Sequence, residues 1–340
     1  MLLFEPAPGI QVHASSLLVR PSGDHVVAWF AGAHEGSPDS TVHVLTSDDA
    51  TIRPIAPDDD LPHWNPVLAD GPDGRTWLFF KRGHRIDEWT TWVCTSGDGG
   101  HSWSAPTELV PGDRSGGRGP VRQAPLLLGG LWLAPGSVEV WEPPRWDSFL
   151  DVSSDGGLTW EQVPLPLDHS AVRGAGCIQP SLVVLPDARL VVLTRSSGGS
   201  VHRSVTRDPY SWPTLQPSTL PNNNSGIAAA ALADGRIVVC HNDASDDWGA
   251  RSRLVLSESR DAGESWRQVA VVVDGAVGGP AAPTGTGAPS AAAATGVVTT
   301  GEGEYSYPSM QVVRSDLWIT HTVERRSIAL HRVALASITN

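Results

Sequence analysis

Two internal repeats in the 340-residue sequence predict an all-β fold, a six-bladed β-propeller closed by both chain termini. The first repeat is an eight-residue motif, Ser-x-Asp-x-Gly-x-x-Trp, which occurs three times. The second is a hairpin of two short apolar runs around a turn, which occurs six times. No stretch keeps a helical period. Because each hairpin is too small to bury its own apolar faces, stacking of like sheets in a closed ring is expected.

The eight-residue motif occupies residues 96–103, 153–160 and 259–266. Its Ser and Asp can bond nearby backbone groups, its Gly allows positive φ, and its Trp can fill the space between neighbouring sheets. The copies start 57 and 106 residues apart, and 106 is twice 53. Degenerate copies fit residues 206–212 and 46–50, so five units of about 53 residues leave room for a sixth.

Each hairpin consists of short apolar runs bounded by turn residues, which is typical of β-strands. The hairpins span residues 17–30, 67–80, 126–134, 182–193, 229–240 and 310–319. We expect one domain over residues 1–340. Residues 274–303 are almost entirely Ala, Gly, Pro, Thr and Val, and we expect a low-complexity insertion there, either a surface excursion or a lid.

Composition narrows the partners and the compartment. A net charge of -13 disfavours nucleic acid and anionic membranes as partners. The first residues have no basic segment followed by an apolar run, as a signal peptide would require, and no run is long enough to span a membrane. Cys94, Cys177 and Cys240 lie in apolar surroundings and are expected to be buried free thiols. We therefore expect a cytoplasmic protein.

Polar and aromatic residues flank all six hairpins. The innermost strands of a propeller start at one face, so residues just before and just after each hairpin should converge on the axis. A purely structural hub would favour small apolar residues there, so we expect a site for a small-molecule or glycan substrate. The expected binding residues are His13, Glu35, Trp64, Asn65, Lys81, Arg122, Gln179, Arg195, Asn224, His241, Tyr307, His321 and Arg325, with Trp146 as a further ring that could stack on a sugar.

The flanking segments also carry a resemblance to a known family. They are residues 13–15, 30–36, 63–66, 119–122, 179–180, 224–227 and 304–308. Together with the eight-residue motif, known as the Asp-box or bacterial neuraminidase repeat, they resemble the predicted-neuraminidase branch of the sialidase-like β-propellers. The resemblance runs through nearly the whole chain and implies a six-bladed propeller with a site on its axis.

The resemblance also implies roles for individual residues. Sialidases hold the substrate carboxylate with three arginines, attack with a Tyr assisted by a Glu, and use an Asp as acid/base. By position, these roles fall to Arg195 and to Arg325 or Arg326, to Tyr305 or Tyr307 with Tyr305 preferred, to Glu139, and to Asp39. The sequence departs from the family where the first arginine belongs to an Arg-Ile-Pro segment, because residues 13–15 read His-Ala-Ser.

We expect neither a metal nor a cofactor. Five histidines, His13, His34, His63, His241 and His321, fall on the segments expected at the axis, but none has the spacing of a compact metal motif. The acidic runs at residues 58–60 and 243–247 are expected to be solvated turns, with calcium binding as the alternative.

The leading hypothesis is an exo-acting hydrolase that releases a terminal acidic sugar, with Glu139, Tyr305 and Asp39 as its catalytic residues. One alternative is a lyase, or an enzyme acting on a small metabolite, that uses His and Tyr. A second is a non-catalytic propeller that binds partners on its rim.

Overall fold

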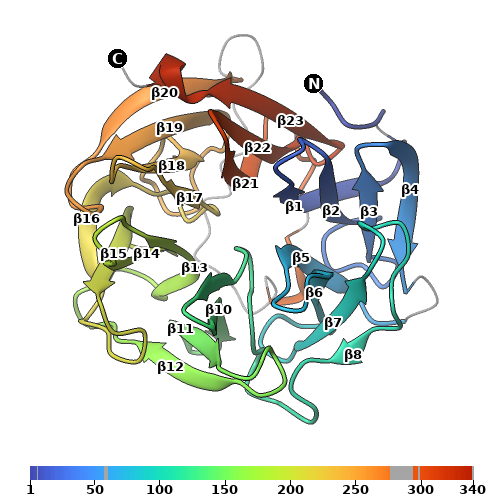
Figure 1. The fold of residues 1–340 in the computed structure, drawn as a ribbon, viewed down its shortest axis with the longest axis horizontal. Coiled ribbons are helices and arrows are strands. Elements are labelled where there is room, and N and C mark those ends of the chain that lie inside the picture. The colour runs from blue at the N-terminus through green and yellow to red at the C-terminus, as the bar shows by residue number, and fades with distance from the viewer. Residues whose placement is uncertain (6, 57–59, 276–293, 298, 339–340) are drawn as a thin grey trace.

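The computed structural model describes residues 1–5, 7–56, 60–275, 294–297 and 299–338. Six antiparallel sheets surround a central axis, each a meander in sequence order (Figure 1). The all-β, six-bladed propeller predicted from the sequence is confirmed. Of the insertion expected at 274–303, residues 276–293 and 298 lie outside the described residues.

The first three blades contain twelve strands. Blade 1 consists of β1 (Gln11–Val19), β2 (His25–Gly32), β3 (Thr41–Thr46) and β4 (Asp49–Ile55). Blade 2 consists of β5 (His63–Asp70), β6 (Thr76–Arg82), β7 (Thr90–Ser96) and β8 (Thr107–Glu108). Blade 3 consists of β9 (Leu126–Leu128), β10 (Leu131–Trp141), β11 (Pro144–Ser153) and β12 (Glu161–Leu165).

The last three blades complete the ring. Blade 4 consists of β13 (Cys177–Val184), β14 (Leu190–Ser196), β15 (Ser200–Thr206) and β16 (Gln216–Pro221). Blade 5 consists of β17 (Ala228–Ala231), β18 (Ile237–Asn242), β19 (Arg253–Ser259) and β20 (Arg267–Asp274). Blade 6 consists of β21 (Tyr305–Val313), β22 (Asp316–Val323) and β23 (Ser327–Ala334), followed by the 3-10 turn η2 (Leu335–Ile338).

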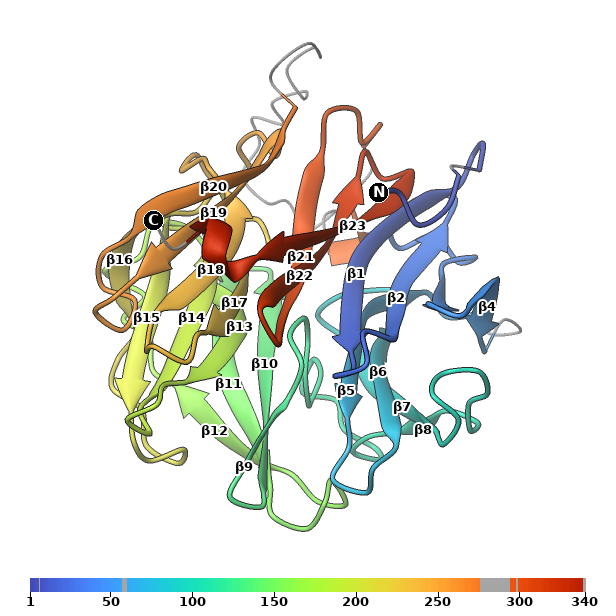
Figure 2. The same ribbon diagram turned by 45° about the horizontal axis from the view of Figure 1, so that its top comes forward.

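Both chain ends close the sixth blade, as predicted. Its three strands come from the C-terminal part of the chain, and the first residues pair with the outer strand β23. Leu2 forms an antiparallel bridge with Ala329, and the Leu3 amide donates to the Ile328 carbonyl at 2.9 Å. Figure 2 shows the N-terminal segment running alongside β23. This pairing joins the blade that ends the chain to the segment that begins it.

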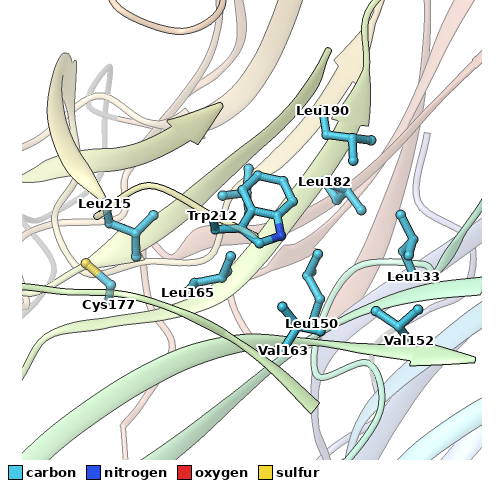
Figure 3. Packing of buried hydrophobic residues seen from close by; sticks show 11 residues of the cluster. Leu133, Leu150, Val152, Val163, Leu165, Cys177, Leu182, Leu190, Trp212 and Leu215 are labelled. Carbon is cyan, nitrogen blue, oxygen red and sulfur yellow. The ribbon is translucent and has the colours of Figure 1, made fainter. Parts of the chain in front are cut away.

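The six predicted hairpins are the two inner strands of the six blades. Inner strands are buried on both faces because each blade packs against two neighbours, as β13 and β14 show. Between blades 3 and 4, Leu133 and Leu150 pack against Leu182 and Leu190 (Figure 3). Trp212, from the degenerate motif copy, belongs to the same cluster.

All three complete motif copies form the turn between the third and fourth strands of their blades. In each, the Trp indole N–H donates to the carbonyl of the motif Gly, at 3.1 Å for Trp103 and Trp160 and 3.0 Å for Trp266. The predicted structural role of the motif is therefore observed on the outer turns, away from the axis.

Two further expectations concern thiols and membrane spans. Cys94, Cys177 and Cys240 are buried free thiols, and burial raises the pKa of Cys94 to about 12. Within the described part of the chain, no helix has the length and apolarity needed to cross a membrane.

Candidate active site

A backbone distortion recurs on the innermost strands where they approach the axis. The register shifts between His13 and Ser16 in β1, and at the equivalent points of β5, β13 and β21. Each shift contains a non-glycine residue with positive φ: Ala14 (56°), Asn65 (43°), Gln179 (53°) and Tyr307 (53°). Asn224, just before β17, has φ of 58°. Such bulges re-aim a side chain and concentrate next to functional sites.

These bulges decide which side chains face the axis. Asn65, Gln179 and Tyr307 line one pocket, and Asn224 bonds a residue that lines it. Ala14, the equivalent residue of blade 1, instead packs under Tyr307 and leaves it room. Three of the bulged residues precede a proline, which cannot donate a ladder hydrogen bond and is tolerated in a strand at such a bulge.

The pocket lies on the propeller axis and has a volume of about 460 Å³ including its open mouth. It draws on every blade and on the insertion before β21. Its wall consists of Glu35, Trp64, Asn65, Ile86, Trp89, Glu139, Trp141, Gln179, Arg195, Trp248, Arg251, Val297, Tyr307 and Arg325.

Arg195, at the end of β14, holds the pocket's tyrosine. Its Nη1 donates to the Tyr307 hydroxyl oxygen at 2.6 Å and to Gln179 Oε1 at 3.2 Å. Its Nε donates to Asn224 Oδ1 at 2.7 Å. All three acceptors are neutral groups, so among the described residues no carboxylate is ion-paired with Arg195.

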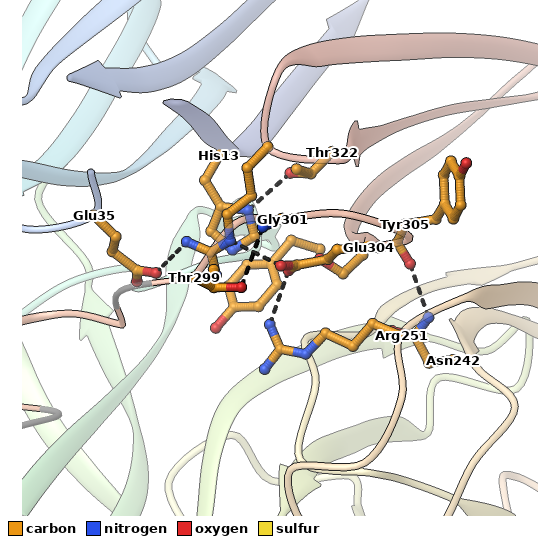
Figure 4. A network of polar contacts seen from close by, with 12 residues as sticks. His13, Glu35, Asn242, Arg251, Thr299, Gly301, Glu304, Tyr305 and Thr322 are labelled. Atoms are coloured by element: carbon orange, nitrogen blue, oxygen red, sulfur yellow. Dashed lines mark hydrogen bonds and ion pairs between the residues drawn. The ribbon is translucent and has the colours of Figure 1, made fainter. Parts of the chain in front are cut away.

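The other two arginines of the wall are neutralised from within the protein (Figure 4). Glu304 accepts from Arg325 Nε at 2.8 Å and from Arg251 Nη1 at 3.1 Å. Arg325 also donates to Glu35 Oε2 at 2.6 Å. Despite its burial, the pKa of Glu304 is held well below its usual range by Arg325 and Arg251. Arg195 is therefore the arginine of the wall that has no ion-pair partner among the described residues.

Glu139, on β10, is the carboxyl group of the wall with the most perturbed environment. Burial raises its pKa to about 7, Glu35 and Asp87 act in the same direction, and Arg195 opposes them. It forms no hydrogen bond or ion pair with any described residue, and its side chain is 5% exposed. A carboxyl group in this state can take up or release a proton near neutral pH.

Aromatic side chains form the opposite side of the wall. Trp64 of β5, Trp89 of the β6–β7 loop and Trp141 of β10 belong to one buried cluster with Ile86. Trp64 and Trp89 meet edge to face with ring centroids 5.8 Å apart. Trp248 joins this side to the cationic one, because Arg195 and Arg251 both lie about 6 Å from its ring. The pocket thus has an aromatic half on blades 2 and 3 and a cationic half on blades 4 to 6.

Several predicted site residues lie beneath the wall. Arg122 is buried and crosses the axis, donating to the Ser15, Tyr307 and Pro308 carbonyl oxygens. His13 packs against the Tyr307 ring at 4.2 Å, and burial lowers its pKa well below the usual value. Both residues support Tyr307 from below rather than facing the cavity, and Asn224 positions Arg195 in a similar way.

Other predicted residues point into the blades. Lys81 donates to Thr91 Oγ1 at 2.6 Å and to the Arg118 carbonyl at 2.7 Å, and burial lowers its pKa to about 7. His241 bonds Ser257, and His321 bonds His331 at 3.0 Å. Trp146 packs edge to face on Trp141, behind the wall. Neighbouring strand residues face opposite sides, so the correct segment places only some of its side chains in the pocket.

Two of the three expected catalytic residues are not brought to the pocket. The Tyr305 ring turns away from the Glu304 cluster, and burial and Glu324 raise its pKa (Figure 4). The bulge at Tyr307 explains why the side chains of these two tyrosines, which belong to one strand, point in different directions. Asp39 is exposed in the β2–β3 loop, where hydrogen bonds from Ser37 and from the Ala33 amide lower its pKa. Neither arrangement suits the role expected from the resemblance.

The wall also contains residues that the sequence analysis did not single out. Trp141 lies two residues after Glu139 on β10, so strand alternation could have placed both on one face. Glu304, which neutralises two arginines behind the wall, lies within segment 304–308, but the sequence analysis assigned it no role of its own. Trp89, Trp248 and Arg251 come from loops without a local signal, and Val297 comes from the insertion.

Metal binding has no geometric support in the described ranges. No group of three or more His, Cys, Asp or Glu side chains there could hold a metal ion. Asp58 and Asp59, considered above for calcium, lie outside the described residues, and Asp243 is ion-paired with Arg253.

Fold and site together define a class: a six-bladed β-propeller of Asp-box repeats with an arginine- and tryptophan-walled pocket on its axis. The chain belongs to the BNR repeat-like domain family, whose sequence pattern matches residues 23–319. No curated protein sequence matches it.

Solved structures with the same fold include carbohydrate-active enzymes. The NanB sialidase from Streptococcus pneumoniae has 12% identity and a TM-score of 0.70, covering 100% of this chain and 71% of its own. The Hadza microbial sialidase Hz136 has 15% identity and a TM-score of 0.69, covering 97% of this chain; the match spans 66% of the Hz136 chain. The α-L-arabinanase of Penicillium chrysogenum has 14% identity and a TM-score of 0.65, covering 99% and 98%. At these identities the likeness shows the fold.

Proposed function

We propose that the protein is an exo-acting glycoside hydrolase of sialidase type that releases a terminal acidic sugar. The observation that carries the proposal is the contact of 2.6 Å between Arg195 and the Tyr307 hydroxyl, beside a Glu139 that has no ion-pair partner in the described structure. Nucleophile, cation and proton-transfer group thus share one small pocket. Tyr307 takes the role that the sequence assigned to Tyr305.

The charge of the wall favours an anionic ligand. Arg195, Arg251 and Arg325 give three guanidinium groups, as the resemblance implies, with Arg251 in place of the missing Arg-Ile-Pro arginine. Glu304 and Glu35 compensate two of them. The remaining charge at Arg195 matches a ligand with one carboxylate, because guanidinium groups pair well with carboxylates.

The chemistry is a double displacement. The Tyr307 oxygen forms a bond to the anomeric carbon while its proton passes to Glu139, and the glycosidic bond breaks with its electron pair on the leaving oxygen. The leaving oxygen takes a proton from solvent as it departs. Water then attacks the anomeric carbon, the bond between that carbon and the Tyr307 oxygen breaks with its electron pair on the oxygen, Tyr307 regains its proton from Glu139, and the proton lost by water returns to solvent. A tyrosine nucleophile is the known exception to the carboxylate pair of most glycosidases.

The lyase alternative finds less support in the site. No histidine lines the pocket wall that the described residues form. His13 is buried under Tyr307, and burial lowers the pKa of His241 to about 4, as it does for His321. A His and Tyr pair for elimination is thus not assembled in this cavity.

The two tyrosines of β21 offer a matched test. Fluorogenic sialosides and uronides should be incubated with the wild-type protein and with Tyr307→Phe, Tyr305→Phe and Glu139→Gln. We expect Tyr307→Phe and Glu139→Gln to lower kcat/KM at least about 1000-fold, in the range seen for loss of central catalytic groups. Tyr305→Phe should stay within about twofold of wild type.

The pH dependence of kcat/KM is an independent test of the role of Glu139. Glu139 must be ionised to accept the tyrosine proton, so kcat/KM should rise with pH and level off above about 7. Equal loss of activity in both tyrosine variants, or no product from any substrate, would contradict the proposal. A product absorbing near 235 nm would identify a lyase instead.

A further inference from the structure

The end of the low-complexity insertion crosses the propeller. The chain leaves blade 5 at Asp274 and enters blade 6 at Tyr305. Between these points, residues 294–297 lie against the loops of blades 1 and 2, on the far side of the axis from blade 5. Residues 294–297 therefore lie beside the axial pocket.

Contacts fix residues 294–297 to the aromatic half of the pocket. The Ile86 amide donates to the Ala294 carbonyl at 2.7 Å. Ala294 is fully buried in the cluster that contains Trp64 and Trp89. Val297 forms part of the pocket wall itself.

Two glycines allow the backbones to meet directly. A Cβ at Gly36, where φ is +80°, would lie 2.1 Å from the Thr295 carbonyl oxygen and 2.6 Å from Trp64 Cη2. A Cβ at Gly296, where φ is +109°, would lie 2.2 Å from the Glu35 carbonyl oxygen. Any larger residue at either position must push the two segments apart.

We propose that residues 294–297 are a specificity wall, which closes the blade 1 and blade 2 side of the pocket so that only a single terminal sugar enters. The identity of the ligand rests on the proposed function. The wall's seat, between Gly36, Trp64 and Ile86, rests on the contacts alone. In this arrangement, residues 294–297 restrict the enzyme to cleavage at the end of a glycan chain.

The wall also positions the cationic half of the pocket. Its Gly296 packs on the Glu35 backbone, and the Glu35 carboxylate holds Arg325 at 2.6 Å. Displacing the wall therefore moves the counter-ion of Arg325. Glu35 acts here as a positioning residue, since it fixes another side chain.

The seat can be tested without activity. Gly36→Ala and Gly296→Ala variants of the full chain should be compared with wild type by amide hydrogen exchange at Ile86. Because this amide loses its acceptor when the wall is displaced, we expect exchange at least about tenfold faster in both variants.

The chain offers matched controls for backbone strain. Gly112 has φ of +80° and Gly23 has φ of +99°, and a Cβ at either would meet nothing within 4 Å. Gly112→Ala and Gly23→Ala therefore impose the same conformational cost without touching the wall. We expect Ile86 exchange in these variants to stay at the wild-type rate.

Substrate selection is the second readout. The probes are the 4-methylumbelliferyl sialoside and the same glycoside with a second sialic acid on its sialic acid. An exo enzyme removes the capping sugar first, so the product followed for the capped probe is the intact disaccharide. The ratio of kcat/KM for its release to that for release of sialic acid from the uncapped probe should rise at least about tenfold in Gly296→Ala and remain unchanged in Gly23→Ala.

The outcomes separate the two proposals. Unchanged exchange at Ile86 in both wall variants, or faster exchange with an unchanged substrate ratio, overturns the wall. If wild type hydrolyses neither probe, the sialidase function fails, and the exchange rates together with calorimetric Kd values for the two probes decide the wall separately.

Discussion

The outer turns and the axis of this propeller use repetition in opposite ways. In the three complete motif turns, the same side chains make the same bonds: Ser Oγ donates to Asp Oδ1 at 2.8 Å, and the Gly amide donates to Ser Oγ at 2.8 Å. At the axis, four inner strands share a bulge and a positive φ but carry different residues there: Ala14, Asn65, Gln179 and Tyr307.

The outer turns are alike because they serve folding, whereas the axial residues differ because they form the pocket. Each outer turn meets the same local requirement, so one residue pattern serves every blade. Three of the four axial bulges place a side chain in the pocket wall, and these side chains, Asn65, Gln179 and Tyr307, differ in their chemistry. The backbone repeats at the axis while the chemistry diverges.

The largest effect should come from the axial counter-ion. Glu304→Gln removes the only ion-pair partner of Arg251 found in the described structure. It also removes one of the two carboxylates that are ion-paired with buried Arg325. Breaking a buried pair by removing one partner typically costs about 3–5 kcal/mol. Urea denaturation of the variant should show a loss in this range.

Glu258 on the outer part of blade 5 provides the comparison. It is ion-paired with three arginines where Glu304 is ion-paired with two, but Arg260 and Arg267 are more than half exposed, and Arg236 keeps Asp234 at 2.8 Å. Glu258→Gln should therefore cost about 1–2 kcal/mol. Equal losses in the two variants would remove the distinction between axis and periphery.

Glu139→Gln should stabilise the protein at neutral and higher pH. Because folding raises the pKa of this carboxyl from 4.5 to about 7, folding favours its protonated form, and wild-type stability falls as pH rises between these values. Above pH 7 the variant should gain up to about 3 kcal/mol, and the gain should vanish below pH 4.5.

Denaturation curves at several pH values measure this difference, with Glu161→Gln, an exposed site on β12, as control. A gain that does not depend on pH would show that Glu139 is not strained by burial. A gain with loss of activity would place it among groups retained for function at a cost in stability.

Smaller and equal effects are expected at the outer turns. Ser96→Ala, Ser153→Ala and Ser259→Ala each remove the acceptor of one buried Gly amide and should each cost about 1 kcal/mol. Because the turns lie in different blades, a triple variant should lose the sum. Strong non-additivity of the stability losses in thermal denaturation would mean that the outer turns are energetically coupled, like the hydrogen-bonded residues at the axis.

The smallest effect is expected at Asp39. Its carboxylate caps the Ala33 amide at 3.1 Å and lies outside the pocket. Asp39→Asn should leave kcat/KM within about threefold of wild type. A loss as large as that of Glu139→Gln would restore the acid/base role suggested by the resemblance.

Much of the architecture could be predicted because its causes are local. The motif turns, the Gly129-Gly130 turn between β9 and β10, and the closure of the ring by both chain ends follow from patterns within a few residues or from counting repeats. The segments around the axis were predictable as well, since every inner strand starts at the same face.

The orientation of single side chains at the axis was not predictable in this way. Tyr305 and Tyr307 share a strand and a sequence context. Because of the bulge at Tyr307, where φ is 53°, only Tyr307 faces the pocket. Arg251 and Trp248 reach the pocket from a loop, and Ala294 and Val297 from a low-complexity segment with no pattern of its own.

The sequence by itself determined the repeat, the number of blades, the outer turns and the segments that meet at the axis, because these depend on short-range hydrogen bonding and apolar period. Only the tertiary structure decided which side chains face the cavity, that Glu304 neutralises two arginines, and that the hydrogen-bond acceptors of Arg195 are neutral groups. Those outcomes depend on contacts between different blades, and no single blade encodes them.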